Sequence, residues 1–313
     1  MDELFEQPFV VVAHRGGGEE VAENTIKGIR HALRVGAEVI EIDLRATKDN
    51  EIILLHDEDF ARVAGIEARP GDLDLAYIKD TILIFDQEPV ATLKEALEVV
   101  AGKAVLFLEI KEEGIVDKVL ELIRLYEAKS WVVVISFLES VIKQVKSADA
   151  SIKTGLIYNR PPGKIVEAKE LGADLVLPRH DLATYKAIAF AHSLGLKVVT
   201  WTVNDKVELA RLLHDGCDGV ATDYPSKFVH IKKDLFSKKP LHVVEKRLKL
   251  QLKDNGFFYD LVMKDKVLEE IDSKDELYAK LRKKLPKVTV FKDNGRYYIE
   301  GEVSQKELRE LLG

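Results

Sequence analysis

Histidines follow two of the short apolar runs in this chain. His14 and Arg15 come directly after the run at residues 9–13, and His56 comes after the run at residues 52–55. An imidazole titrates near neutral pH and transfers protons, while a guanidinium neutralises an anion such as a phosphate. These residue types suit the cleavage of a phosphate ester, although His14 and Arg15 alone would fit an ordinary surface equally well.

Carboxylates lie inside two further apolar runs. Glu41 and Asp43 are separated by one residue, so in a strand both point to the same side, and Glu109 with Lys111 repeats this spacing. Buried carboxylates cost several kcal/mol unless they are paired or bind a metal. Ion pairs of Glu109 with Lys111 or of Asp43 with Arg45 are the alternative. Three carboxylates exceed what one lysine balances, which favours a bound cation.

The ligands of that cation would all be oxygens, which predicts one divalent cation of the hard class, Mg²⁺ or Ca²⁺, or else Mn²⁺. With it, the chain holds a complete set of groups for phosphodiester cleavage. Of His14 and His56, one acts as a base and the other protonates the leaving oxygen. The metal, Arg15 and Lys111 hold the phosphate and offset charge in the transition state.

The apolar runs alternate with amphipathic stretches, which predicts an α/β fold with a parallel sheet. About eight strands over the first 220 residues favour a TIM (β/α)8-type barrel. No Gly-x-Gly-x-x-Gly motif follows a strand, so an open dinucleotide-binding sheet is disfavoured. The predicted strands are residues 9–13, 39–44, 52–55, 105–110, 131–135, 154–158, 175–177, 197–201 and 219–222, and the predicted helices include 24–35, 92–100, 115–128, 163–171, 183–194 and 206–214.

One connection is too short for a crossover helix. Residues 45–51 allow only a tight turn, which predicts a hairpin whose register would set Glu41 beside His56. Residues 57–91 carry little periodicity and are rich in turn residues. We expect them to form a short insertion after the third strand, with one or two short helices, beside the pocket.

The chain changes character after Pro225, where it becomes Lys-rich without further strand–helix alternation. We predict a barrel domain over residues 1–230 and a small α+β domain over 231–313. Residues 253–259 resemble 292–298 at an offset of 39, and 267–271 resemble 307–311 at an offset of 40. Asp-Asn-Gly turns predict hairpins, so a duplicated ββα unit is the interpretation, with coincidence as the alternative. Its expected role is a homodimer contact or a lid, or else regulatory binding.

Composition excludes several classes of function. The net charge of −7 gives no reason to expect nucleic-acid binding. No apolar run reaches the roughly 18 residues of a membrane span, and the first residues lack a basic region followed by an apolar one. Cys217 is the sole cysteine, which excludes an intrachain disulfide. We therefore expect a soluble, cytoplasmic protein acting on a small molecule.

Short motifs occur in order over residues 9–230. They are His14-Arg15-Gly16, Glu23-Asn24-Thr25, residues 36–43, Thr47-Lys48-Asp49, His56-Asp57, residues 108–111, Ser136-Phe137, residues 201–204 and residues 222–225. Together they resemble the glycerophosphodiester phosphodiesterase family. The sequence departs from the family pattern at Ala22, where the family often has proline and which concerns only the entry to the first helix, and in the short insertion at residues 57–91, which bears on the size of the substrate pocket.

This resemblance implies a barrel that hydrolyses glycerophosphodiesters to glycerol 3-phosphate and an alcohol. A neighbouring hydroxyl that attacks first, giving a cyclic phosphate, is one route. Trp201 matches an aromatic position of the pocket, with barrel packing as its other reading. The resemblance assigns acid/base catalysis to His14 and His56, metal binding to Glu41, Asp43 and Glu109, and phosphate contacts to Arg15 and Lys111.

Two other functions fit the same residues. A lysophospholipase D-like enzyme would use them on a diester with a lipid tail, and an apolar groove in residues 57–91 would favour it over a small pocket. A non-catalytic barrel that only binds phosphodiesters is the second, and the complete set of catalytic residue types argues against it.

Overall fold

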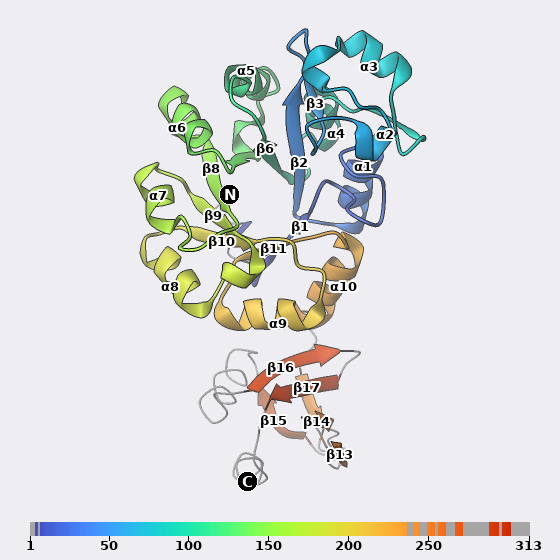
Figure 1. Cartoon of the computed structure of the whole chain (residues 1–313). Helices are drawn as coiled ribbons and strands as arrows, with labels where there is room; N and C mark the ends of the chain where they lie inside the picture. Colours follow the sequence, from blue (N-terminus) through green and yellow to red (C-terminus); the bar gives the residue numbers. More distant parts are fainter. Residues whose placement is uncertain are drawn as a thin grey trace. The chain divides into compact units, whose positions relative to one another are not determined.

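The computed structural model describes residues 4–5 and 7–236 of the chain and, beyond them, strands β12 to β17 (Figure 1). The chain divides into two compact units, Met1–Val229 and His230–Gly313. None of the helices described combines the length and the apolar character that crossing a bilayer demands.

The first unit is a closed (β/α)8 barrel. Strand β1 (Val10–Ala13) pairs in parallel with both β2 (Val39–Ala46) and β11 (Gly219–Thr222), which closes the ring. The predicted TIM-type barrel is therefore confirmed. The other parallel strands, in order around the ring, are β6 (Val105–Ile110), β7 (Val132–Ser136), β8 (Lys153–Tyr158), β9 (Leu175–Pro178) and β10 (Lys197–Thr200).

Apolar side chains fill the inside of the barrel. Val12, Phe107 and Val199 belong to one buried cluster, against which Phe5 packs. The Phe5 ring also lies 5.7 Å from the ammonium of Lys197, the first residue of β10. Phe5 is therefore at the N-terminal end of the strands, and this cluster closes that end. The polar residues that follow the strands are left at the opposite, carboxyl end, where barrel enzymes have their active sites.

Helices cover the outside of the barrel, and threonine side chains cap three of them, at Thr25, Thr92 and Thr184. The Thr25 hydroxyl accepts the Gly28 N–H, and Thr92 forms a reciprocal capping box with Glu95. The outer helices are α1 (Ile26–Val35), α4 (Leu93–Val100), α5 (Val116–Leu125), α6 (Glu139–Ala148), α7 (Ile165–Glu170), α8 (Tyr185–Ser193), α9 (Lys206–Asp215) and α10 (Pro225–Phe236), with short 3-10 turns at Ala128–Ser130 and His180–Leu182.

Helix α10 corrects the expectation that strand–helix alternation ends at Pro225. It begins at that proline, which suits the first position of a helix because its missing N–H would have no partner there. Phe228 and Val229 are buried, and Lys232 beside them is also largely covered. The sequence analysis missed this helix because lysines lie between its apolar residues and weaken the amphipathic pattern.

The predicted hairpin is confirmed, with a correction to its register. Strand β3 (Ile52–Leu54) pairs antiparallel to β2, with Leu44 opposite Leu54, and the Leu55 N–H still bonds to the Asp43 carbonyl. The pairing of β2 with β3 ends at this hydrogen bond. His56 is the residue after Leu55, which lies opposite Asp43, whereas we expected His56 beside Glu41.

The insertion after β3 has the one or two short helices expected and a small core of its own. Phe60, Val63, Ile78 and Ile82 are buried together in it. This core fixes the insertion against the barrel through Ile53 of β3. Its elements are α2 (Ala61–Ala64), a 3-10 turn (Pro70–Asp72), α3 (Leu75–Thr81), β4 (Leu83–Ile84) and β5 (Glu88–Pro89).

The second unit contains antiparallel strands. β13 (Lys249–Lys253) pairs with β14 (Gly256–Asp260), and β16 (Val288–Asp293) pairs with β17 (Arg296–Gly301), as the two Asp-Asn-Gly turns predict. Residues 267–271, expected as a helix, form instead strand β15 (Val267–Ile271), which pairs with β12 (Leu241–Val244). Five residues are too few for periodicity to separate the two, and Val267 and Ile271 favour a strand. Residues 307–311 lie outside the described residues.

Carboxylates before two barrel strands tie neighbouring strands together at their N-terminal ends. Asp174, just before β9, accepts the Thr154 N–H of β8 at 3.0 Å. Asp218, just before β11, accepts the Val198 N–H of β10 at 2.8 Å. Each carboxylate thus satisfies a strand-end donor that the ladder leaves unpaired.

We expect Asp174→Asn to lower the free energy of unfolding by about 1–3 kcal/mol at pH 7, because Lys146 and Lys153 lose their charged acceptor. Burial raises the pKa of Asp174, but the hydrogen bonds from these two lysines outweigh it and leave the pKa below its usual value. The contribution is therefore present above the unfolded pKa of about 3.9 and is lost as pH falls through the lowered folded value.

Urea unfolding at pH 7 and about pH 3 measures this difference. The control is Asp181→Asn, which removes the acceptor of an exposed pair with Arg179 and should change stability by less than about 1 kcal/mol. Equal losses in the two variants at pH 7 would contradict the role given to Asp174.

Candidate active site

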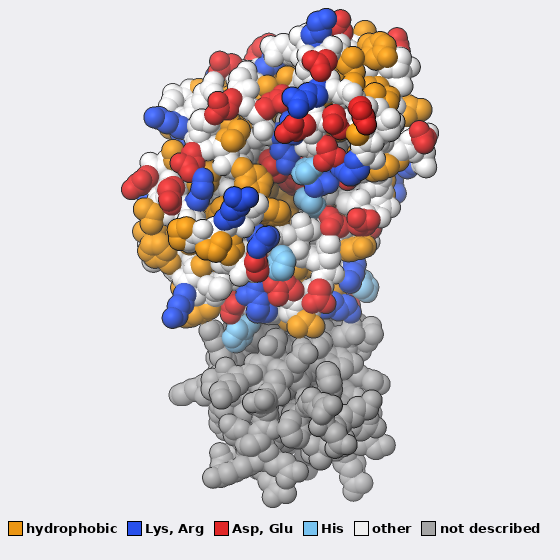
Figure 2. All heavy atoms as spheres, viewed as in Figure 1, with side chains coloured by type: hydrophobic (Ala, Val, Ile, Leu, Met, Phe, Trp, Pro, Cys, Tyr) orange, Lys and Arg blue, Asp and Glu red, His pale blue; other side chains and the backbone are white. Residues whose placement is uncertain are grey.

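A cavity of about 310 Å³ lies at the carboxyl end of the barrel strands. Figure 2 shows this region of the first unit, where histidine, acidic and basic side chains gather beside hydrophobic ones. One side of the cavity is polar and the other is apolar. Its lining includes seven of the eight predicted site residues, His14, Arg15, Glu41, His56, Glu109, Lys111 and Trp201. The eighth, Asp43, is 1% exposed and contacts Lys111.

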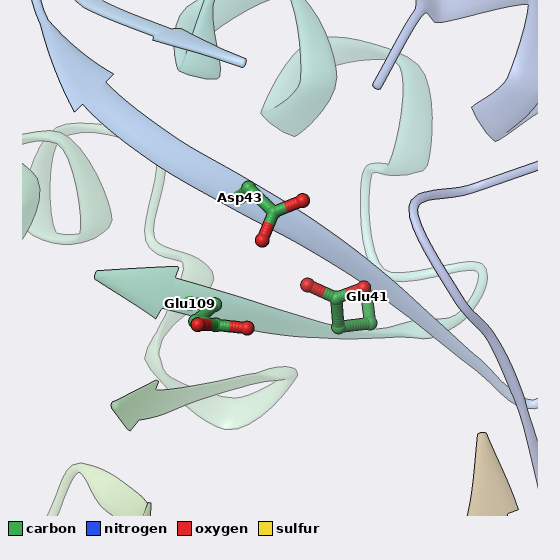
Figure 3. A group of neighbouring side chains, drawn as sticks. All are labelled: Glu41, Asp43 and Glu109. Atoms are coloured by element: carbon green, nitrogen blue, oxygen red, sulfur yellow. The ribbon is translucent and has the colours of Figure 1, made fainter. Parts of the chain in front are cut away.

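Three carboxylates converge at this cavity. Glu41 and Asp43 come from β2 and Glu109 from the adjacent β6, where Asp43 is the direct neighbour of Glu109 (Figure 3). One oxygen from each lies within 4.8 Å of the others, and all three residues are buried. Glu41 Oε1 has no hydrogen-bond partner among the described residues. A buried carboxylate oxygen without a partner is costly, so this donor set fits a metal ion.

Lys111 pairs with two of these acids, at 2.9 Å from Asp43 Oδ1 and 2.5 Å from Glu109 Oε1. The Glu109–Lys111 pair considered from the sequence therefore exists. The other, Asp43 with Arg45, does not, because the Arg45 guanidinium bonds to Glu112. Lys111 does not reach Glu41, whose Oε1 has no hydrogen-bond partner among the described residues, so the Glu109–Lys111 pair does not replace a cation.

The charge balance shifts the pKa values of the acids in opposite directions. Burial and the charge of Asp43 raise the pKa of Glu41 to about 8. Burial also acts on Asp43, but Lys111, His56 and Arg15 outweigh it and hold its pKa below the usual value. Burial also raises the pKa of Glu109, so two of the three acids favour the neutral form more than a free carboxyl does, as expected where carboxylates outnumber the nearby positive charges.

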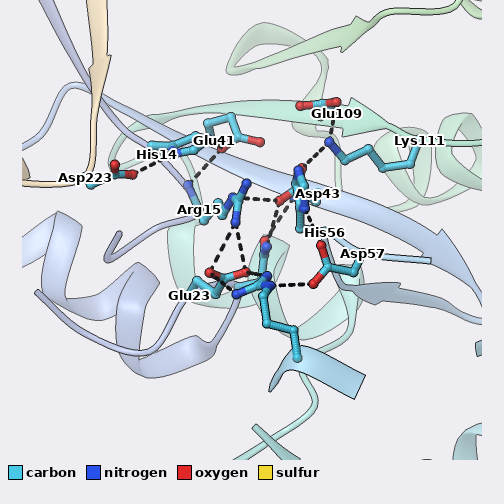
Figure 4. A network of polar contacts seen from close by, with 12 residues as sticks. His14, Arg15, Glu23, Glu41, Asp43, His56, Asp57, Glu109, Lys111 and Asp223 are labelled. Carbon is cyan, nitrogen blue, oxygen red and sulfur yellow. Dashed lines mark hydrogen bonds and ion pairs between the residues drawn. The ribbon is translucent and has the colours of Figure 1, made fainter. Parts of the chain in front are cut away.

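His14 is held from both sides. Its Nδ1 lies 2.7 Å from Asp223 Oδ1, and its Nε2 lies 4.0 Å from Glu41 Oε2 (Figure 4). Asn204 fixes the aspartate by donating to Asp223 Oδ2 at 2.6 Å and accepting the Asp223 N–H at 2.9 Å. Burial lowers the pKa of His14, but the hydrogen bond to Asp223 and the charge of Glu41 outweigh it and raise the pKa overall.

His56 has a matching arrangement. Its Nδ1 lies 2.8 Å from Asp57 Oδ1, and Arg45 donates to its backbone carbonyl at 3.0 Å. Burial is the main cause that lowers the pKa of His56. In both histidines a carboxylate occupies Nδ1, so Nε2 is the nitrogen available for proton transfer with a bound ligand.

Arg15 has a left-handed backbone, with φ of 52°, which is rare outside glycine. This conformation aims its N–H at Glu41 Oε2, at 2.8 Å, while its guanidinium bonds to Glu23. Gly18 makes the following turn possible, since a Cβ there would lie 2.4 Å from Asp223 Cα. The glycine run at 16–18 is a tight turn that brings the β1 loop against Asp223.

Trp201 lines the apolar side of the cavity, as predicted. Its ring meets Phe137 edge-on, with centroids 5.6 Å apart, and its Nε1 donates to the Leu177 carbonyl at 2.8 Å. These contacts fix the ring at the rim, so the residue is both part of the barrel packing and part of the cavity wall.

The sequence interpretation gave no role to several residues that hold the site. Asp223 lies 209 residues from its partner His14, and no local pattern links them. The Asn24 side chain, part of the Glu23-Asn24-Thr25 motif, donates to Asp43 Oδ2 at 2.7 Å and accepts the Asp43 N–H at 3.0 Å. Asp223 follows strand β11 and lies in the motif at residues 222–225, and these two signals could have identified it.

Comparison with known proteins matches residues 14–227 to the model of the glycerophosphoryl diester phosphodiesterase family. A glycerophosphodiester phosphodiesterase of Caldanaerobacter subterraneus is 30% identical over 71% of this chain and 97% of its own length. The chain belongs to the glycerophosphoryl diester phosphodiesterase family. It is accordingly a hydrolase of phosphodiesters.

Two further matches show how broad the likeness is. Human lysophospholipase D is 24% identical over 70% of this chain and 85% of its own length. The solved structure of an Oleispira antarctica phosphodiesterase, in complex with the product sn-glycerol-3-phosphate, superposes with a TM-score of 0.65 at 24% identity, covering 72% of this chain and 96% of that one. All these matches leave about a quarter of this chain or more uncovered.

We expect a divalent cation to displace the proton of Glu41. Because burial and Asp43 raise the pKa of Glu41 to about 8, this carboxyl is protonated at pH 7 in the metal-free protein. Cation affinity should therefore rise with pH up to about 8 and then level off, with about one proton released per ion at pH 7 and almost none near pH 9.5.

Isothermal titration calorimetry in buffers of different ionisation enthalpy counts the released protons. Glu41→Gln should bind the cation more weakly and lose this proton release. Proton release that is the same in the variant would contradict the assignment.

Proposed function

We propose that this enzyme hydrolyses glycerophosphodiesters to glycerol 3-phosphate and an alcohol, with a divalent cation held by Glu41, Asp43 and Glu109. The observation that carries the proposal is the juxtaposition of His14 and His56 with the acidic cluster around one cavity. The Oleispira antarctica relative, solved with sn-glycerol-3-phosphate, supports the choice of substrate class.

The two histidines would move the protons. One imidazole takes the proton of the attacking hydroxyl through Nε2, and the other gives a proton to the leaving alcohol oxygen. If the attacking group is the neighbouring hydroxyl of the glycerol, a cyclic phosphate forms first. Water then opens it, with the proton roles of His14 and His56 exchanged.

The charged groups would hold the phosphate. Arg15 and Lys111 line the cavity. Burial alone would lower the pKa of both, but the charges of Asp43 and the other nearby carboxylates outweigh it and raise the pKa, which keeps both protonated. When bound, a divalent cation supplies Lewis-acid charge that offsets the negative charge on the phosphoryl oxygens. The all-oxygen ligand set supports Mg²⁺ or Ca²⁺, or Mn²⁺.

The size of the cavity supports a short alcohol rather than a lipid tail. At about 310 Å³ it is at the low end for ligand pockets, and no residue of 57–91 is in its lining. An apolar groove in that insertion was the feature expected of a lysophospholipase D-like enzyme. The likeness to human lysophospholipase D keeps that activity as the alternative.

We expect release of glycerol 3-phosphate from glycerophosphocholine, glycerophosphoethanolamine or glycerophosphoglycerol to stop in EDTA and return with Mg²⁺, Ca²⁺ or Mn²⁺. His14→Ala and His56→Ala should each lower kcat by about 10²–10⁴-fold, because each removes a proton-transfer group. His230→Ala, an imidazole that is 77% exposed, is the control and should leave kcat unchanged. No product from folded, metal-loaded enzyme would favour a binding role or lipid substrates.

A matched pair of substrates tests the size argument. Glycerophosphocholine should have a higher kcat/KM than lysophosphatidylcholine presented below its micelle concentration, because the cavity does not extend along the insertion. A higher kcat/KM for the lysophospholipid would make the lysophospholipase D-like activity the better description.

We also propose a cytoplasmic location, supported by the buried free thiol of Cys217, and a barrel domain over residues 1–230 followed by a dimerising domain over residues 231–313. Light scattering on the full chain and on a chain that ends at residue 230 measures the oligomeric state. A full-length monomer would exclude the dimer.

A further inference from the structure

Arg62 belongs to the insertion, on helix α2, and was not among the predicted site residues. Its neighbours Phe60 and Val63 are buried in the core of the insertion, which fixes the helix. The Arg62 side chain is 45% exposed and extends from α2 to acids at the mouth of the barrel. Arg62 does not line the cavity.

The Arg62 guanidinium bridges two carboxylates from different parts of the chain. Its Nε donates to Asp57 Oδ2 at 2.6 Å. Its two terminal nitrogens donate to Glu23, Nη2 to Oε1 at 2.6 Å and Nη1 to Oε2 at 3.1 Å. The fork of arginine suits this arrangement, since three nitrogens of one guanidinium donate to two carboxylates.

Each of these carboxylates also holds a residue of the cavity. Asp57 uses its other oxygen, Oδ1, to bind His56 Nδ1 at 2.8 Å. Glu23 accepts two hydrogen bonds from Arg15, both at 3.2 Å. The chain of contacts therefore runs from His56 through Asp57, Arg62 and Glu23 to Arg15, and Figure 4 shows the labelled members of it side by side.

We propose that Arg62 is a positioning residue of this active site, which fixes the His56–Asp57 pair and the Arg15–Glu23 pair relative to each other. The inference rests on the proposed function for the meaning of both pairs. It also gives the insertion a role: the insertion orients the catalytic groups from outside the cavity.

Arg62 is expected to affect the rate of the reaction through the geometry of the site and not through the stability of the fold. An ion pair of an exposed arginine contributes only about 0–1 kcal/mol to folding. A reacting group displaced by about 1 Å can nevertheless lower the rate by about 10²-fold. Without Arg62, Asp57 Oδ2 loses the guanidinium that fixes its orientation, and His56 can turn with it. Glu23 loses the donors opposite Arg15.

The test compares Arg62→Ala and Arg62→Lys with Arg69→Ala. Arg69 is the matched control, since it lies in the same insertion, is 69% exposed and pairs with Glu58 alone among the contacts described. We expect kcat/KM for the best glycerophosphodiester to fall by about 10–100-fold in Arg62→Ala, as for other residues that orient a site. The kcat/KM of Arg62→Lys should lie between the values of the wild type and of Arg62→Ala, because one ammonium replaces the guanidinium that bridges the two carboxylates. Arg69→Ala should stay within about twofold of wild type.

Two readouts separate positioning from a general structural effect. In Arg62→Ala we expect lower kcat, from the displaced His56, together with higher KM, from the displaced Arg15, at a nearly unchanged unfolding temperature. Added methylguanidinium should restore part of the activity of Arg62→Ala, with sodium chloride as the ionic-strength control. It should not restore His56→Ala or change Arg69→Ala.

A crystal structure of Arg62→Ala beside that of wild type tests the inference independently of activity. We expect the His56–Asp57 contact, the Arg15–Glu23 contact or both to be broken or split between conformers in the variant. Unchanged contacts would overturn the inference, as would wild-type kinetics of Arg62→Ala in an active enzyme. Inactive wild type would instead count against the proposed function, and the two crystal structures would still decide the role of Arg62.

Discussion

Three carboxylates buried at one end of a barrel are the constraint to which the rest of the site responds. Removing each charge from water costs several kcal/mol unless partners replace the lost hydration. Lys111 pairs with Asp43 and Glu109, Arg15 gives its backbone N–H to Glu41, and one oxygen of Glu41 keeps no partner among the residues described. The cluster is therefore short of positive charge, and a divalent cation would complete it.

The barrel makes this arrangement possible because the residues that stabilise the fold and the residues that could react lie at different ends of the strands. Its interior and its N-terminal end are closed by apolar packing, and carboxylates such as Asp174 and Asp218 tie the strand starts together. The carboxyl ends are then free to carry polar residues. Adjacent parallel strands bring Asp43 and Glu109 opposite each other although the two residues lie far apart in the sequence.

Around the reactive groups, a further set of side chains fixes their orientation. Asp223 with Asn204 holds His14, Asn24 holds Asp43, and Asp57 holds His56. Each holder uses both of its polar atoms, so it has little freedom to turn. Because both polar atoms of each orienting side chain are hydrogen-bonded, histidines at the ends of two different strands can face one ligand.

The sequence by itself predicted the barrel and eight site residues, seven of which line the cavity. Apolar runs predicted the strands. His14 and His56 were visible because they directly follow such runs, and Glu41 and Glu109 because they are charged residues inside them. It misjudged residues 267–271 and missed α10, because five residues carry too little periodicity and lysines masked an apolar face.

Only the tertiary structure decided which residues hold the site. Asp223 and His14 meet across 209 positions of sequence, and Arg62 reaches Glu23 across 39. Such contacts depend on where the barrel closes and on how the insertion packs on Phe60 and Val63. A local pattern records the propensity of a segment and not its distance from another segment. The reactive groups could therefore be predicted from the sequence, whereas the contacts that orient them could be identified only in the folded structure.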